Sequence, residues 1–175
     1  MSIKNLRTRH AELTRDLILD AAIGLLTNSE TEELSVRSVA QRAGMSERTV
    51  FRYFAARDEL LDAVAAEMNR RLAPPLLPER LADLPGYPAA IFARFEALEA
   101  LTRAALRSDV YERIRSGDLV QRGVHIAKLI DEAAPDVDAV FRRLIAANIH
   151  YHVIASSWAY YRFRFGFSAE DTVAA

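Results

Sequence analysis

The sequence predicts an all-α protein, and three observations support this fold class. Apolar residues make up 51% of the 175 residues and charged residues 27%, which is the balance of an ordinary globular protein. Only 6 glycines and 6 prolines occur, so there are few places where a helix must end. Apolar residues also recur every three or four positions over long stretches, which is typical of helices with one buried face.

Helices are predicted in chain order from this periodicity. Leu13, Leu17, Ala21 and Leu25 recur every four residues and define the first helix. Gly117 and the residue after it open a late helix, and the prolines and cap residues delimit the others. The predicted helices span residues 14–27, 36–43, 47–54, 58–72, 88–107, 108–115, 117–133 and 136–165.

The prolines indicate how the chain is divided. Five of the six lie between Pro74 and Pro88, the clearest shift in composition, and a boundary between domains is expected there. We therefore expect an N-terminal arm with a helix-turn-helix domain, a connecting helix, a proline-rich linker and a C-terminal helical domain, over residues 1–57, 58–73, 74–88 and 89–175.

Composition argues against several classes of function. The chain has no cysteine, which removes disulfides, thiolate catalysis and cysteine-based zinc sites. No apolar run approaches the roughly 18 residues of a membrane span, so we expect a cytoplasmic protein. No paired carboxylates with a nearby histidine, nucleophile motif or phosphate loop occurs, so neither an enzyme nor a cofactor is expected. His150 and His152 are two apart and diverge on a helix, so no metal is expected.

Residues 35–54 have the spacing of a helix-turn-helix. Ser35 and Ser46 are suited to cap two short helices. Ala40 is small enough for the helices to cross, Gly44 tolerates the positive φ of the turn, and Val50 locks the second helix against the first. Val39 and Phe54 complete the predicted small core.

The distribution of charge is compatible with nucleic-acid binding although the formal net charge is −1. Residues 1–15 carry Lys4, Arg7, Arg9 and Arg15 against one glutamate, and the first three of these cations lie in what we expect to be a flexible arm. Residues 34–57 carry five arginines against Glu47. Exposed charges are screened beyond about 10 Å, so a phosphate backbone responds to the local patch. Solvated helix faces are the alternative explanation.

The run SVRSVAQRAGMSERTVFRYFAARDELLDAV, residues 35–64, resembles the DNA-binding signature of the TetR family of bacterial regulators. The resemblance extends over roughly residues 14–65. Phe51 stands where the family usually has Tyr, Tyr53 where His is frequent, and Arg57 where Lys is usual. Residues 28–29 replace a common glycine. These departures affect individual contacts.

The resemblance implies that the second helix of the motif enters the major groove of double-stranded DNA. Arg48 and Arg52 are the candidates for reading guanine, because a guanidinium matches the two acceptors on its edge. Arg37 could reach the same groove, and Thr49 could contact a thymine methyl or a phosphate. The candidates for phosphate contacts, which fix orientation and not sequence, are Ser35, Ser46, Tyr53 and Arg57. The complete predicted set is Ser35, Arg37, Ser46, Glu47, Arg48, Thr49, Phe51, Arg52, Tyr53 and Arg57.

The family also implies a homodimer on a palindromic operator. The expected interface is residues 136–165, with an apolar stripe of Val140, Leu144, Ala147, Tyr151, Ala155 and Trp158. A regulator of this kind, which we expect to be a repressor, releases DNA when a small-molecule effector binds its C-terminal helices. The sequence does not distinguish repression from activation. The candidate effector residues are Met68, Phe92, Phe95, Tyr111, His125, Asn148 and His152.

Two further expectations concern function and length. A helical small-molecule carrier without sequence-specific DNA binding is the alternative function. Ser168 and Asp171 have the spacing of a capping box, yet the chain ends four residues later, at Ala175. One helical turn is expected to bury little, so we expect the natural chain to continue.

Overall fold

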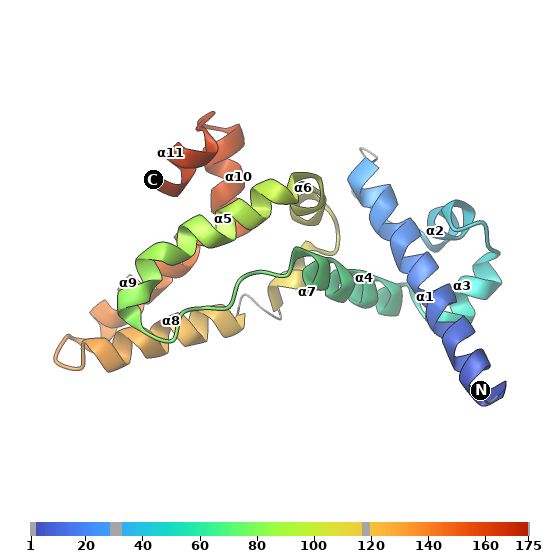
Figure 1. The fold of residues 1–175 in the computed structure, drawn as a ribbon, viewed down its shortest axis with the longest axis horizontal. Helices are drawn as coiled ribbons and strands as arrows, with labels where there is room; N and C mark the ends of the chain where they lie inside the picture. Colours follow the sequence, from blue (N-terminus) through green and yellow to red (C-terminus); the bar gives the residue numbers. More distant parts are fainter. Residues whose placement is uncertain (1–2, 29–32, 117–119, 175) are drawn as a thin grey trace.

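The computed structural model describes residues 3–28, 33–116 and 120–174, and this part of the chain contains helices and no strand. Figure 1 shows the helices that carry the motif at one end of the long axis and a helical hairpin at the other. In chain order they are α1 (Ile3–Asn28), α2 (Val36–Arg42), α3 (Glu47–Tyr53), α4 (Arg57–Leu72), η1 (Leu81–Gly86), α5 (Tyr87–Ala97), α6 (Glu99–Arg107), α7 (Tyr111–Ile114), α8 (Val120–Ala133), α9 (Ala139–His152), α10 (Ala155–Phe163) and α11 (Ala169–Ala174). None of these is both long and apolar enough to span a bilayer.

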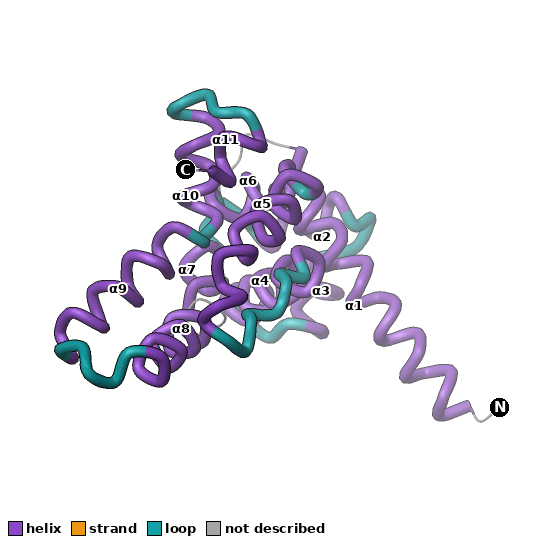
Figure 2. Tube along the Cα trace, turned by 60° about the vertical axis from the view of Figure 1, so that its left-hand side comes forward, coloured by secondary structure: helices purple, strands orange, loops and turns teal. Residues whose placement is uncertain are grey.

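The first helix is longer than predicted. Its backbone is already helical at Ile3, so the expected flexible arm is wrong. Residues 8–13 are exposed, so no buried face marks this part of the helix in the sequence. Leu13 and Leu17, which were expected on the buried face, are more than half exposed. Figure 2 shows the N-terminal end of α1 extending away from the rest of the molecule.

The N-terminal core joins α1–α4 to two later helices. Apolar side chains of the first four helices pack with Leu101, Ala104 and Ala105 of α6 and with Val110, just before α7. The predicted buried side of α4 is confirmed, since all of its apolar members are buried: Leu60, Leu61, Val64, Ala65 and Met68.

A second core lies in the C-terminal half. It is built by residues of η1, α5, α8, α9 and α10 around the fully buried Trp158. The Trp158 ring packs 5.8 Å from the Phe95 ring, and its indole nitrogen donates a hydrogen bond to Glu96 at 2.9 Å. The placement of Trp158 in the predicted dimer stripe is therefore wrong, because its side chain faces its own protomer.

Two predicted long helices are broken. The helix predicted over residues 88–107 ends at Leu98, which has φ −123° and ψ 38°. The break lets α5 pack in the C-terminal core while α6 packs in the N-terminal core. The helix predicted over residues 136–165 breaks at Val153 and Ile154, which turns Trp158 inward. Both breaks serve tertiary packing, and neither is marked by proline or glycine.

Cap predictions have mixed outcomes. Pro88 lies in the first turn of α5, as predicted. Ser108 does not cap α7, because its hydroxyl donates back to the carbonyl of Ala105. The capping box of Ser168 and Asp171 is present, and Thr172 is the one residue of α11 that is buried, in agreement with the expectation that this turn buries little. The predicted opening of a helix at residues 117–118 lies outside the described residues.

Candidate nucleic-acid interface

The turn between α2 and α3 is built as the sequence predicts. Gly44 has φ +66°, a left-handed conformation that disfavours every residue with a Cβ atom. The Gly44 amide donates to the carbonyl of Gln41 at 3.2 Å and the Met45 amide to that of Ala40 at 2.9 Å. These bonds close the end of α2 and aim the chain into α3.

We expect Gly44→Ala to lower the free energy of unfolding by about 1–2 kcal/mol through backbone strain. A Cβ at Gly44 would meet no heavy atom within 4 Å, so steric overlap does not contribute. Gly86→Ala is the matched control, because Gly86 has equally open surroundings but φ −81°. Urea denaturation measures both variants, and equal stabilities would contradict this account of the turn.

Serine side chains begin both helices of the motif. The Ser35 hydroxyl accepts from the Ser38 amide at 3.0 Å, and the Ser38 hydroxyl in turn accepts from the Ser35 amide at 3.3 Å. The Ser46 hydroxyl accepts from the Thr49 amide at 3.2 Å and lies 2.9 Å from the Thr49 hydroxyl. The predicted caps are therefore confirmed, and the proposed phosphate contacts of Ser35 and Ser46 would be made by side chains that already hold the helices.

The motif is locked by a small buried core. Val39 and Val50 are fully buried, and Ala40 and Phe54 are nearly so. Because this core fixes the rotation of α3 about its axis, it also fixes which side chains of α3 reach solvent.

The outer face of α3 is polar and cationic with one exposed aromatic ring. Glu47, Arg48, Phe51 and Arg52 are exposed, with the Phe51 side chain 46% accessible. Arg37 of α2 is also exposed. Within the part of the chain that the structure describes, neither Arg37 nor Arg48 has an ion-pair partner, so both guanidinium groups remain available to an anion.

Tyr53 is the last residue of α3 and lies beside its cationic face. The Arg52 guanidinium lies 5.2 Å from the centre of the Tyr53 ring. A hydrogen bond with Thr14 of α1 and, next, one with Arg52 lower the pKa of the Tyr53 phenol from its ordinary value. Arg15 of α1 lies 5.1 Å from the Phe54 ring. Sequence reasoning did not associate α1 with this end of the recognition helix, because the contact depends on how the helices cross.

Arg57 has different surroundings from those expected of a phosphate contact. Its guanidinium donates to the carbonyl of Leu34 at 2.7 Å, forms an ion pair with Asp109, and lies 3.6 Å from Glu33. These partners turn Arg57 toward the protein. They tie the start of α4 to the junction of α6 with α7, and a phosphate contact by Arg57 stays a prediction.

We expect a double-mutant cycle on Arg57→Ala and Asp109→Ala to give a coupling of about 1 kcal/mol in unfolding free energy. The two side chains are 39% and 26% exposed, which moderates the energy of the pair. The Arg103–Glu99 pair, at 44% and 42% exposed, is the control and should couple by about 0.3–0.5 kcal/mol. A coupling no greater than that of the control would contradict the tie.

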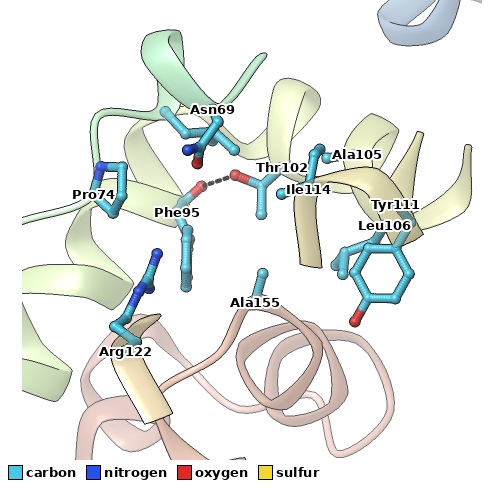
Figure 3. Close-up of a pocket in the computed structure, with 11 residues that line it drawn as sticks. Asn69, Pro74, Phe95, Thr102, Ala105, Leu106, Tyr111, Ile114, Arg122 and Ala155 are labelled. Carbon is cyan, nitrogen blue, oxygen red and sulfur yellow. Dashed lines mark hydrogen bonds between the residues drawn. The ribbon is translucent and has the colours of Figure 1, made fainter. Parts of the chain in front are cut away.

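The predicted effector residues fall in several separate places. Met68 is buried in the N-terminal core and Phe92 in the C-terminal core, and neither is among the residues that line the cavity of Figure 3, so their part in an effector pocket stays a prediction. His125 is bonded to the carbonyl of Pro78 at 3.0 Å. Asn148 and His152 line an open groove between η1 and α9, where His152 also bonds the Tyr161 hydroxyl at 2.8 Å.

Phe95 and Tyr111 do line one cavity, which lies between α4, α5, α6, α7, α8 and α10 (Figure 3). Sequence reasoning missed its polar members, and no pattern in the sequence marks them, because they come from three helices: Asn69, Thr102 and Arg122. Among the described residues, no three side chains of the types that bind metals gather at one place.

These features define a helical protein with a helix-turn-helix for binding DNA. Residues 18–64 match the family model described as bacterial regulatory proteins, tetR family. The helix-turn-helix domain of the chain therefore belongs to the TetR family.

Relatives of the chain are named as regulators with the same motif. The uncharacterized HTH-type transcriptional regulator Rv1255c of Mycobacterium tuberculosis is 39% identical over 67 residues, which are 38% of this chain and 33% of the relative. The HTH-type transcriptional repressor Rv3405c of the same organism is 30% identical over 122 residues, which are 70% of this chain and 60% of the relative. The HTH-type transcriptional regulator Mb3439c of Mycobacterium bovis has the same values. The chain thus spans between a third and three fifths of the lengths of these relatives.

Proposed function

We propose that the protein is a homodimeric repressor that binds a palindromic operator through α3 and is released by a small-molecule effector. The observation that carries the proposal is the exposure of Arg48 and Arg52 on a recognition helix whose start, rotation and turn are all fixed. Such a helix presents its guanidinium groups in one orientation, which is what sequence reading requires.

Each contact of the proposed complex has a separate task. Arg48 and Arg52 read guanine edges in the major groove, and Thr49 contacts a thymine methyl or a phosphate. Arg37 reaches the same groove from α2. Phosphates are bound by Ser35, Ser46 and Tyr53, and these contacts fix the register of the motif on the duplex. Glu47 and Phe51 flank the groove.

A dimer is needed because a recognition helix of seven residues covers only a few base pairs. The proposed dimer contact lies on the α8–α9 hairpin, and the exposed apolar residues of these two helices support this location. On α9, Val140, Leu144 and Tyr151 are each more than half exposed, and α8 adds Val120 and Val124. Exposed apolar residues gathered on one face favour association with another surface.

The proposed division of labour follows the predicted boundaries. Residues 1–57 bind DNA, and residues 89–175 bind the effector and form the dimer. Between these two domains, residues 58–73 form the connecting helix and residues 74–88 the proline-rich linker. An effector must bind one arrangement of the dimer more tightly than the other in order to release DNA.

The proposal is tested by mixing purified protein with a pool of genomic DNA fragments at moderate salt and sequencing what is retained. The wild type should enrich fragments that contain an inverted repeat, and the Arg48→Ala/Arg52→Ala variant should not. Enrichment of no motif, or equal enrichment by both proteins, would overturn the proposal and favour the alternative, a helical ligand carrier.

A further inference from the structure

The cavity of Figure 3 is lined by apolar side chains and by three polar ones, Asn69, Thr102 and Arg122. Its apolar lining includes Leu72, Pro74, Phe95, Tyr111 and Ile114. The Thr102 hydroxyl donates to the carbonyls of Leu98 at 3.0 Å and Phe95 at 3.4 Å, so its proton is committed to the backbone. The Tyr111 hydroxyl is 2.6 Å from that of Ser156.

Arg122 is the charged group of this cavity. In Figure 3 its side chain extends from α8 beside Phe95 and toward Pro74. Within the described ranges, no acidic side chain forms an ion pair with it, whereas the neighbouring Arg115 lies 3.4 Å from Glu112. A half-buried guanidinium in apolar surroundings gains much from an anion that enters beside it.

The electrostatics of His150 agree with an uncompensated charge. Burial lowers the pKa of His150, and the positive charges of Arg122 and then Arg115 lower it further. The Nε2 atom of His150 is buried without a hydrogen-bond partner among the described residues. Of these two arginines, Arg122 is the one that has no acidic partner among the described residues, since Arg115 pairs with Glu112.

We infer that the cavity binds a small monocarboxylate with an apolar body, whose carboxylate pairs with Arg122. A planar carboxylate matches the two parallel N–H donors of a guanidinium. A phosphate monoester carries close to two negative charges at neutral pH, and one arginine would leave the second charge uncompensated among apolar groups. This inference rests on the proposed function, since the ligand is the proposed effector.

The cavity is small, so binding of a ligand must move part of its wall. The cavity holds about 50 Å³, whereas an apolar cavity of about 150 Å³ accommodates benzene. An acid with an aromatic or branched body must therefore displace a wall, and α7, with only four residues, supplies Tyr111 and Ile114 to that wall. The α7 residue Arg113 bonds Asp58 at 2.6 Å and approaches Asp62 at 3.2 Å, both near the start of α4. Displacement of α7 thus acts on the helix that follows α3.

The test measures thermal unfolding of the whole chain with benzoate, phenylacetate and 3-methylbutanoate, each beside its neutral amide, and with phenyl phosphate. We expect at least one carboxylate to raise Tm, its amide and phenyl phosphate to have little effect, and Arg122→Met to weaken carboxylate binding about 10–100-fold. Lys128→Met is the matched control, because Lys128 is exposed on the same helix and pairs only with Glu132 among the described residues. It should bind as the wild type does.

Three results would overturn the inference: no carboxylate-dependent shift, equal shifts with acid and amide, or undiminished binding by an Arg122→Met variant. Circular dichroism and the Tm without ligand establish that the variant is folded, and Arg122→Lys, which keeps the charge without the planar fork, gives a second test with intermediate binding expected. DNA binding without ligand is measured on the same samples. Retained DNA binding with no carboxylate binding refutes the ligand alone, whereas carboxylate binding without DNA binding refutes the proposed regulator.

Discussion

Replacing Arg48 and Arg52 together by alanine should weaken binding to the selected operator at least 100-fold while leaving residual non-specific binding. Each well-formed arginine–guanine contact discriminates by about 1–3 kcal/mol, so two contacts give about 2–6 kcal/mol in each half-site. Both side chains are exposed on α3 and lie outside the buried core, so the fold should be kept, and Arg52→Ala also removes the contact of Arg52 with the Tyr53 ring. Fluorescence anisotropy with a labelled duplex measures the loss.

The control for this experiment is Arg80→Ala/Arg107→Ala. It removes the same two positive charges from exposed positions outside the helix-turn-helix. Its affinity should fall by much less, because only the long-range attraction to phosphate is changed. Equal losses in the two variants would mean that Arg48 and Arg52 act as general charges and do not read bases.

The largest expected effect on stability is that of Trp158→Ala, which should cost about 3–5 kcal/mol of unfolding free energy. Trp158 is fully buried, packs against Phe95, and has its ring centre 5.5 Å from that of Phe163. Its removal leaves a cavity in the centre of the C-terminal core. Urea unfolding followed by far-ultraviolet circular dichroism measures the change.

Trp158→Phe is the matched variant and should cost less, because it keeps an aromatic ring and loses chiefly the bond to Glu96. Glu96 retains Arg162 as a partner, so its carboxylate is not left unpaired. A Trp158→Ala protein within about 1 kcal/mol of the wild type would contradict the placement of this side chain in the core.

The helix-turn-helix could be predicted from sequence because its signals are local. Ser35, Gly44 and Ser46 each act on backbone within three or four residues, and the structure has each in its expected role. The breaks at Leu98 and Val153 could not be predicted in this way. Each break depends on which of the two cores the following helix packs in, and the residues of that core are distant in the sequence.

In the candidate sites too, features set by local sequence could be predicted and features set by distant contacts could not. The exposed face of α3 is set by helical periodicity once the core positions Val50 and Phe54 are recognised. The partner of Arg57 lies 52 positions along the chain, so its ion pair with Asp109 has no local signature. The cavity around Arg122 likewise gathers side chains from six helices, and composition could identify apolar candidates but not which of them meet.

The central claim, that α3 reads DNA sequence, is tested most directly by the ratio of affinities for the selected palindrome and for a duplex of the same composition with its half-sites scrambled. Both are measured at one salt concentration, because the phosphate contribution depends on salt. The account predicts a ratio of about 1,000 or more in favour of the palindrome. A ratio near one would contradict it and leave the protein as a binder of small molecules.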